Sequence, residues 1–349
     1  MPKKHKRPYE YYGTPISLVT ITELLPLAQR FAKRLCDAVD VLPSELEPIV
    51  FDQKFFADGE LMSRKPLDAL LRETRVLFLD CPRFPTLNDG IMNTVFTLDA
   101  IAGAGAQNIT HIPLYLPYAR QDKRKPGEPL SWIRIAKMIT HASPQLDRMI
   151  TVELHTEQHE GAFDGLQFTQ VRGHRVFAEH FAAEYRHRAN EVIIVSPDSG
   201  GVPRAKKFAD KLFPDGHHKV AHTEKERPAD NVSEVVSYSG PEAVAGKTIL
   251  IYDDMIDTGG TIAGAARMLK ERGAQKIIAV AMHGLFNNTA LATMSAHGVD
   301  QIVTSESVPR TPEWLAEHSP LLVQVPLDDI LAKVILEQRP GGSVSKIFL

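Results

Sequence analysis

The sequence predicts an α/β protein with two similarly built domains, each a mostly parallel sheet flanked by helices. Short apolar runs alternate with amphipathic stretches of helical length along the chain, which is the pattern of βαβ units. The chain has 349 residues, more than one compact domain usually holds. In both halves a strand ends in a loop with acidic or histidine side chains that opens a helix. This recurrence predicts a domain boundary near Gly165.

The expected elements follow one another in a regular order. Strands are expected at the apolar runs 75–79, 109–116, 149–154, 192–195, 248–252 and 277–282. Helices are expected between them at residues 91–104, 132–140, 173–188, 202–212 and 261–272. Gly273 ends the last of these helices, because glycine readily adopts the backbone conformation that follows a helix C-terminus.

The composition narrows the class of function. Lys and Arg number 40 against 43 Asp and Glu, a net charge of -3, whereas a nucleic-acid binder needs a clear basic excess. No apolar stretch reaches the roughly 18 residues of a membrane span. Two cysteines are too few for a disulfide framework, so a cytoplasmic location is expected. Residues 1–13 read as a flexible basic tail without the apolar core of a signal peptide.

The strongest functional signal is the segment 249–261, ILIYDDMIDTGGT. Gly259 and Gly260 can direct successive backbone N–H groups into one concavity, and Thr258 and Thr261 add hydroxyl donors at a helix N-terminus. These groups predict a phosphate cradle. Asp253, Asp254 and Asp257 at the end of the strand offer only acceptors, which suit the vicinal hydroxyls of a sugar or hydrated Mg²⁺. The alternative reading is a helix cap followed by a glycine turn.

This segment resembles the phosphoribosyl-binding loop of type I phosphoribosyltransferases and of ribose-phosphate diphosphokinases. The resemblance implies two tandem type I phosphoribosyltransferase-like domains. Residues 14–165 would form an N-terminal domain with elements of an ATP site, and residues 166–349 a C-terminal domain with the ribose 5-phosphate loop. Roughly the last 20 residues are expected to pack back on the N-terminal domain.

Further segments resemble the diphosphokinases alone and imply an ATP site. In FFADGE, residues 55–60, Phe56 would stack on adenine while Asp58 and Glu60 accept from its amino group. The resemblance places this segment across a subunit boundary, which implies a homo-oligomer with shared active sites. In YLPYARQDKR, residues 115–124, Arg120 and Gln121 match positions that touch the nucleotide. Alone, the two segments would read as a buried aromatic pair and a solvated charge run.

Three other segments imply metal and transition-state contacts. His155 in TVELHTEQHEGAFD, residues 151–164, and Asp198 in VSPDSGG, residues 195–201, match family positions facing the Mg²⁺ of Mg-ATP. Zinc is the alternative for His155 with His159, but the spacing of Glu157 does not fit H-E-x-x-H. The segment TEKERP, residues 223–228, resembles the mobile catalytic loop of the family, and Lys225 and Arg227 keep the spacing of its Lys and Arg.

The activity implied is transfer of the β,γ-diphosphoryl group of Mg-ATP to the anomeric hydroxyl of ribose 5-phosphate. The products would be phosphoribosyl pyrophosphate and AMP, for nucleotide biosynthesis. One alternative is a type I phosphoribosyltransferase, against which the ATP-type segments argue. The other is a non-catalytic, diphosphokinase-like regulatory subunit, against which the retained metal and lid residues argue. No nucleic acid or membrane is expected as a partner.

Overall fold

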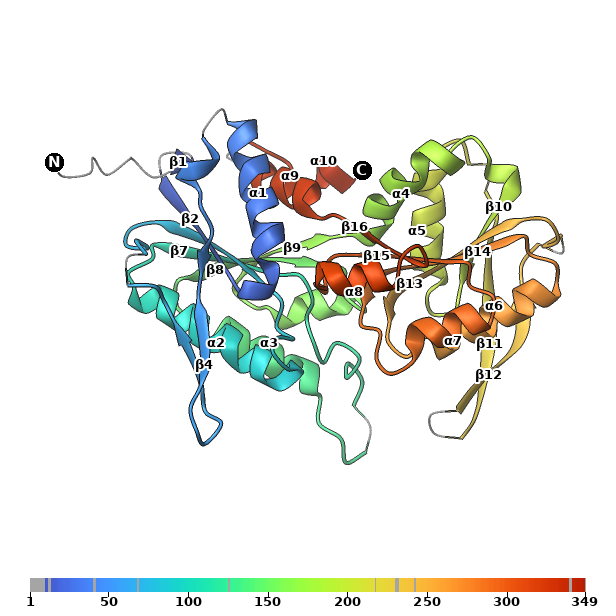
Figure 1. The fold of residues 1–349 in the computed structure, drawn as a ribbon, viewed down its shortest axis with the longest axis horizontal. Helices are drawn as coiled ribbons and strands as arrows, with labels where there is room; N and C mark the ends of the chain where they lie inside the picture. The colour runs from blue at the N-terminus through green and yellow to red at the C-terminus, as the bar shows by residue number, and fades with distance from the viewer. Residues whose placement is uncertain are drawn as a thin grey trace. The chain divides into compact units, whose positions relative to one another are not determined.

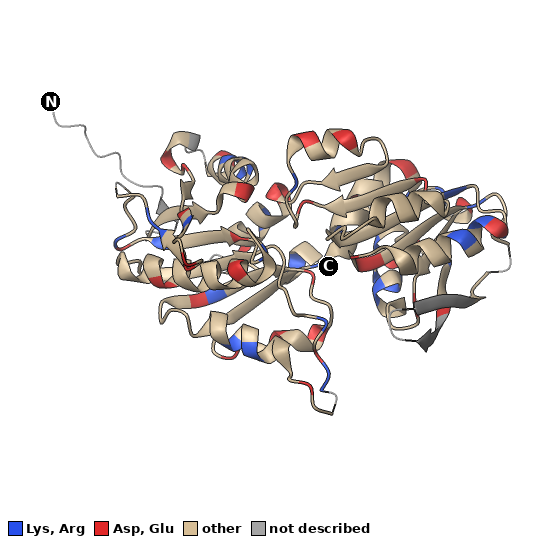
Figure 2. Ribbon diagram, turned by 60° about the horizontal axis from the view of Figure 1, so that its bottom comes forward, with Lys and Arg blue, Asp and Glu red and all other residues tan. Residues whose placement is uncertain are grey.

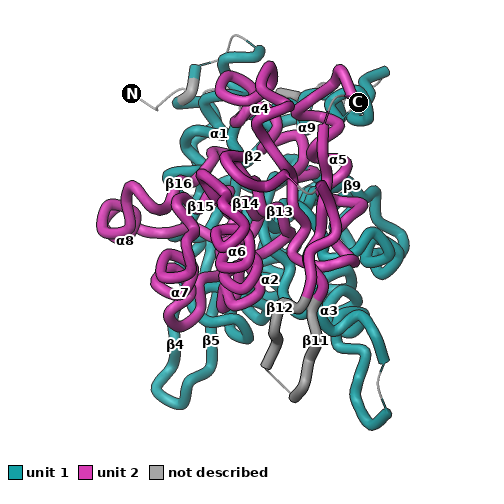
Figure 3. The backbone as a smooth tube through the Cα atoms, turned by 90° about the vertical axis from the view of Figure 1, so that its right-hand side faces the viewer, with its two compact units in different colours: residues 1–171, 327–349 teal, residues 172–326 magenta. Residues whose placement is uncertain are grey.

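The computed structural model describes residues 10–11, 14–39, 42–67, 69–124, 126–216, 218–229, 232–241, 243–338 and 341–348, with backbone alone for residues 10, 11, 43, 225–229 and 232–236. The chain divides into two compact units (Figure 3). Unit 1 comprises Met1–Val171 and Leu327–Leu349, and unit 2 comprises Arg172–Pro326. Each unit has its own mostly parallel sheet between helices (Figure 1), which confirms the predicted fold class.

Unit 1 is built on a sheet in the order β1-β2-β6-β7-β8-β9, with β3 also paired to β2. The neighbours from β2 to β9 run parallel, and β1 is antiparallel to β2. A separate antiparallel hairpin, β4–β5, extends from this unit (Figure 1). The strands are β1 (Glu10–Tyr11), β2 (Thr14–Thr20), β3 (Ile49–Val50), β4 (Asp52–Phe55), β5 (Leu61–Arg64), β6 (Arg75–Asp80), β7 (Asn108–Pro113), β8 (Leu146–Val152) and β9 (Gln167–Val171).

Helices from both ends of the chain cover the sheet of unit 1. They are α1 (Leu25–Ala38), α2 (Leu87–Gly103), α3 (Ser131–Thr140), α9 (Asp328–Glu337) and α10 (Ser345–Phe348), with a short 3-10 turn at Glu157–Ala162. Helix α9 packs beside α1 (Figure 1), where the buried Asp328 forms ion pairs with Arg30 and Arg34 at 3.5 and 2.9 Å. A buried carboxylate needs such partners, so these pairs fix the C-terminal segment to unit 1.

Unit 2 contains a seven-stranded sheet in the order β12-β11-β10-β13-β14-β15-β16. All neighbours are parallel except β11 and β12. The strands are β10 (Val192–Ser196), β11 (Val220–Ala229), β12 (Val232–Ser239), β13 (Thr248–Ile256), β14 (Lys276–Gly284), β15 (Gln301–Ser305) and β16 (Leu322–Val325). The helices are α4 (Gly173–Tyr185), α5 (Val202–Leu212), α6 (Gly260–Glu271), α7 (Ala290–Ala296) and α8 (Pro312–Glu317).

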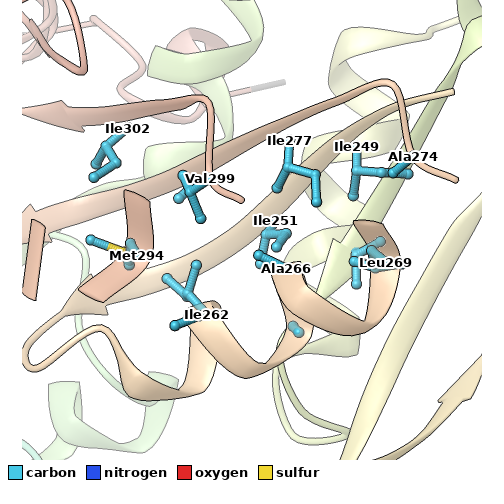
Figure 4. Packing of buried hydrophobic residues seen from close by; sticks show 14 of the residues in the cluster. Ile249, Ile251, Ile262, Ala266, Leu269, Ala274, Ile277, Met294, Val299 and Ile302 are labelled. Carbon is cyan, nitrogen blue, oxygen red and sulfur yellow. The ribbon is translucent and has the colours of Figure 1, made fainter. Parts of the chain in front are cut away.

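Strand β13 is buried on both faces, as expected for a central parallel strand. On one face Ile249 and Ile251 pack against Ile262 and Leu269 of α6, with Met294 of α7 in the same cluster (Figure 4). This packing fixes where α6 begins relative to the end of β13.

The opposite face of β13 packs against α4 and α5 through one aromatic residue. Tyr252 stacks on Phe208 of α5, with ring centroids 4.5 Å apart, and meets Phe177 of α4 edge-on at 6.1 Å. Helices on both faces therefore hold the carboxyl end of β13, where open α/β sheets bind ligands.

Charges of both signs are interspersed along the described parts of both units (Figure 2), in keeping with the small net charge. None of the helices in the described part of the chain is long and apolar enough to cross a membrane.

Candidate active site

The segment that joins β13 to α6 forms a glycine-rich turn at the carboxyl end of the sheet of unit 2. Gly259 has a φ of 72° and lies at the N-cap of α6. A Cβ there would lie 2.9 Å from Met294 Cγ and 3.1 Å from the Ala290 carbonyl oxygen. Positive φ and close packing both demand glycine at this position. The turn therefore leads directly into the N-terminus of α6, where backbone N–H groups can receive an anion.

A second segment supports this turn from the adjacent strand. The backbone N–H groups of Leu285 and Phe286 donate to the Ile256 carbonyl oxygen at 2.9 and 3.1 Å. Asn287 donates to Asp257 twice, from its backbone to the carbonyl oxygen at 3.0 Å and from its side chain to the carboxylate. The loop is thus held in one shape by hydrogen bonds from within unit 2.

Residues 284–286 are in turn held by Arg310. Its guanidinium donates to the carbonyl oxygens of Gly284 and Leu285 at 3.1 and 2.6 Å and lies 4.7 Å from the ring centroid of Trp314. Asn287 and Arg310 were not predicted from the sequence. The parallel pairing of β13 with β14 brings the segment of Asn287 to the loop, and the pairing of β14 with β15 brings that of Arg310.

Asp253 and Asp254 lie near the end of β13 beside Arg204 of α5. Arg204 Nη1 is 3.4 Å from Asp253 Oδ1 and 3.3 Å from Asp254 Oδ1. Burial raises the pKa of Asp253 well above its ordinary value, the negative charge of Asp254 raises it further, and the positive charge of Arg204 opposes both. The pair therefore places two like charges beside one cation, on the strand that leads into the glycine turn.

Asp198 lies in the turn between β10 and α5 of the same unit. Its Oδ1 accepts from the Gly201 backbone N–H at 2.9 Å, and Ser196 Oγ donates to its carbonyl oxygen at 2.7 Å. Its partly exposed carboxylate follows a strand that pairs in parallel with β13.

The predicted lid segment differs from the expected loop. Residues 223–228 lie in β11, which pairs antiparallel with β12 and has two register shifts, between Glu224 and Lys225 and between Glu226 and Ala229. Backbone pairing with a neighbouring strand outweighs a charged composition that disfavours strands. The side chains of Lys225 and Arg227 lie outside the described part of the structure.

The predicted adenine segment forms the tip of the β4–β5 hairpin in unit 1. The turn is closed by hydrogen bonds from Phe56 N–H to the Glu60 oxygen at 2.9 Å and from Gly59 N–H to the Phe56 oxygen at 3.0 Å. Glu60 N–H also donates to Asp58 Oδ1 at 3.1 Å. Phe55 and Phe56 are 49% and 55% exposed within this chain, which contradicts the alternative of a buried aromatic pair.

The other predicted nucleotide and metal residues of unit 1 lie on two neighbouring segments. Arg120 and Gln121 are exposed on the loop after β7, and His155 is partly exposed after β8, which pairs in parallel with β7. The buried His159 links the segments: its Nε2 lies 3.9 Å from Asp122 Oδ2, and its ring is 6.4 Å from that of His155. The structure thus brings the β7 loop close to the segment that follows His155.

A cavity of about 570 Å³ opens between these two segments. Asp122 and Lys123 line it from the first, Trp132 from the start of α3, and Gln158 and His159 from the second. Such a volume admits a small organic ligand.

Among the residues that the structure describes, no three His, Cys, Asp or Glu side chains are grouped closely enough to hold a metal. Mg²⁺ commonly takes only one or two protein ligands and completes its shell with water and substrate phosphates. His155 and Asp198 are both partly exposed, so each could offer a single ligand to a metal of this kind within its own unit.

Two family models match the chain. The model described as the N-terminal domain of ribose phosphate pyrophosphokinase matches residues 16–143. The model described as the phosphoribosyl transferase domain matches residues 171–312. Together they cover most of both units.

Curated relatives share this similarity over nearly their whole length. The chain is 33% identical over 305 residues to a ribose-phosphate pyrophosphokinase of Corynebacterium efficiens, with 87% of this chain and 89% of the relative covered. It is 34% identical over 325 residues to the protein of the same name in Vibrio cholerae, with 92% and 95% covered.

A solved structure gives the same result. The crystal structure of phosphoribosylpyrophosphate synthetase from Mycobacterium smegmatis superposes with a TM-score of 0.73 at 31% identity, covering 93% of this chain and 99% of that one. Sequence and fold therefore agree on one family of relatives.

Proposed function

Because the chain belongs to the ribose-phosphate pyrophosphokinase family of enzymes, we propose that it transfers the β,γ-diphosphoryl group of Mg-ATP to ribose 5-phosphate. The anomeric hydroxyl attacks the β-phosphorus, the bond from this phosphorus to the oxygen shared with the α-phosphate breaks, and AMP leaves. The hydroxyl loses its proton, and phosphoribosyl pyrophosphate is the second product.

The glycine turn after β13 is the observation that carries this proposal. Gly259 and Gly260 with Thr258 and Thr261 bind the 5-phosphate at the N-terminus of α6. Asp253, Asp254 and Asp257 accept hydrogen bonds from hydroxyls of the sugar ring. A phosphate at one end and a diol at the other match ribose 5-phosphate.

Residues of unit 1 bind the nucleotide in this proposal. Phe56 stacks on adenine, Asp58 and Glu60 accept from its amino group, and Arg120 and Gln121 contact the remainder of ATP. The exposure of Phe56 supports this role, because a large aromatic side chain half open to solvent is poised for a contact outside its own unit.

His155 and Asp198 would each offer a ligand to Mg²⁺ bound by the phosphates of ATP, and the charge of the metal would offset the negative charge of the diphosphoryl group. Lys225 and Arg227 would donate to that group from β11 as negative charge builds on the leaving AMP. The protein contributes mainly orientation and charge, since bound reactants held in line need little further chemistry.

The homo-oligomer with shared sites is also part of the proposal. The tip of the β4–β5 hairpin would serve the site of a second copy of this chain, which would cover the exposed ring of Phe56.

One product analysis tests the proposed reaction. The purified protein is incubated with ATP, Mg²⁺ and ribose 5-phosphate, and the nucleotides are separated by ion exchange. AMP that forms only when the sugar phosphate is present is the expected result. ADP in place of AMP would indicate transfer of a single phosphoryl group and would contradict the proposal.

A further inference from the structure

Arg204 contacts both carboxylates of the acidic pair in the sugar site. It lies in the first turn of α5, two residues after the helix begins at Val202. Its Nη1 is 3.4 Å from Asp253 Oδ1 and 3.3 Å from Asp254 Oδ1, and its side chain is 19% exposed. The guanidinium of Arg204 thus forms an ion pair with each of two neighbouring carboxylates.

The acidic pair needs this cation. Adjacent carboxylates repel each other, and burial further penalises their charged forms. Asp254 is 3% exposed, so little solvent screens its charge. A nearby guanidinium offsets these costs while each carboxylate keeps acceptor sites for a ligand.

The turn before α5 fixes the position of the Arg204 backbone. The Gly201 backbone N–H donates to Asp198 Oδ1 just before the helix, and a Cβ on Gly201 would lie 2.5 Å from Ser196 Oγ. The close turn sets the first residue of α5 and hence the direction of Arg204.

Arg204 is separate from the face that anchors α5. The helix is held by the buried Ala205, Phe208, Ala209 and Leu212, and Phe208 stacks on Tyr252. Loss of the guanidinium therefore leaves the hydrophobic attachment of the helix intact. Removing the cation from beside the two acids lowers stability, but the helix stays attached, so ligand binding can be measured on folded protein.

We propose that Arg204 is a positioning residue that holds Asp253 and Asp254 in the orientation that accepts the hydroxyls of ribose 5-phosphate. This inference rests on the function proposed above, which assigns the sugar to these two acids. Arg204 acts through the carboxylates and touches no reacting atom.

Arg204→Met keeps an unbranched side chain but removes the charge and donors. We expect ribose 5-phosphate to bind about tenfold or more weakly, the loss typical of a hydrogen bond between charged groups. The KM for ATP should change by less than about twofold, because the proposed contacts to adenine and those of Arg120 and Gln121 lie in unit 1. Arg204→Lys restores charge without the planar fork and should recover part of the affinity.

Lys206→Met is the matched control on the same helix. Lys206 is 66% exposed and forms an ion pair with Asp210 at 3.2 Å, one turn further along α5. Such a surface pair contributes little, so this variant should bind ribose 5-phosphate like wild type.

Calorimetry on the full chain measures the affinity for ribose 5-phosphate, and steady-state kinetics measure the KM for ATP. Thermal melts verify that each variant is folded. Binding by Arg204→Met within about twofold of wild type, equal losses for both substrates, or no recovery in Arg204→Lys would each overturn the inference. If Arg204→Met does not fold, the affinity of Arg204→Lys for ribose 5-phosphate is compared with that of wild type. An unchanged affinity would overturn the inference. Wild-type protein that binds no ribose 5-phosphate would overturn the proposed function itself.

Discussion

The glycine turn of unit 2 and the β4–β5 hairpin of unit 1 both carry proposed substrate contacts, but their surroundings differ sharply. The turn is hydrogen-bonded to Leu285, Phe286 and Asn287, and its Gly259 packs against α7. The hairpin presents Phe55 and Phe56 to solvent at its tip. One site is shaped within its own unit, and the other lacks a cover in a single chain.

This difference separates two ways of building a binding site. The proposed sugar site is held by hydrogen bonds and packing within unit 2, so its residues are expected to affect stability as well as binding. The hairpin tip is expected to affect nucleotide binding with little effect on folding. Variants of the glycine turn should therefore change both stability and binding, whereas variants of the hairpin tip should change binding alone.

Asp253→Asn should give the largest functional change. The amide keeps the shape of the side chain and one oxygen that can accept from Arg204, but it presents a donor in place of the second oxygen that accepts from the sugar hydroxyl. We expect the KM for ribose 5-phosphate to rise roughly 100-fold with little change for ATP, as for a lost charged contact that leaves a buried partner unsatisfied. Separate titration of each substrate checks this, and equal losses for both would contradict it.

The same variant should be more stable than wild type. Burial and Asp254 raise the pKa of Asp253 in the folded protein, so folding favours its protonated form. The ionised carboxylate lowers the free energy of unfolding. This loss of stability begins as the pH rises above the ordinary pKa of an aspartate, and it is complete above the raised pKa of Asp253 in the folded protein. Asp253→Asn should melt at a higher temperature than wild type at neutral pH, and by a smaller margin in acid.

The exposed Asp215 on the α5–β11 connection supplies the control. Asp215→Asn should leave the melting temperature near that of wild type. A melting temperature for Asp253→Asn at or below wild type at neutral pH would show that the acidic pair stores no strain.

Gly259→Ala should destabilise the protein by about 1–2 kcal/mol, the cost of a left-handed backbone for a residue with a Cβ, with a further cost from contact with Met294. Gly260→Ala is the matched control and should not destabilise the protein, since a Cβ there meets nothing closer than 3.9 Å. Gly260 lies inside α6, where alanine is favoured. Thermal melts compare the two, and equal stability would contradict the packed geometry of the turn.

Phe56→Ala should leave the melting temperature unchanged but raise the KM for ATP by roughly three- to tenfold, the value of one aromatic stack. Phe55→Ala removes a similarly exposed ring from the same hairpin and should leave the KM for ATP near wild type. If both variants raise it equally, general disturbance of the hairpin explains the effect better than stacking.

Mixed chains test whether the hairpin serves a second copy. Phe56→Ala and Lys225→Ala chains, each impaired alone, should regain a modest activity when mixed under exchanging conditions. Regained activity requires that the two residues of one site come from different chains. A mixture no more active than the sum of its parts would show that each site is built from one chain.

The sequence predicted the central features of the fold for a physical reason. Strand β13 and helix α6 have strong apolar periodicity and a glycine turn between them, all local in the chain. The same local chemistry suggests a phosphate cradle at these residues, and that assignment stays a prediction. The family assignment was likewise confirmed, because several short segments keep the same order along the chain.

Contacts between distant segments could not be predicted in this way. Arg204 and Asp253 are 49 positions apart, and Asn287 meets Asp257 only because β14 pairs with β13. The lid segment was expected as a loop from its resemblance to the mobile loop of the family, whereas its strand conformation depends on pairing with β12. These contacts depend on which strands pair in the folded protein, and the local sequence does not specify that pairing.

The proposed diphosphoryl transfer is tested most directly by following the β-phosphorus of ATP. ATP labelled in its β-phosphate is incubated with Mg²⁺, ribose 5-phosphate and the wild-type protein, and the products are separated. We predict that the label moves to the sugar phosphate in step with the formation of unlabelled AMP. Label that stays in a nucleotide, as ADP, would contradict it.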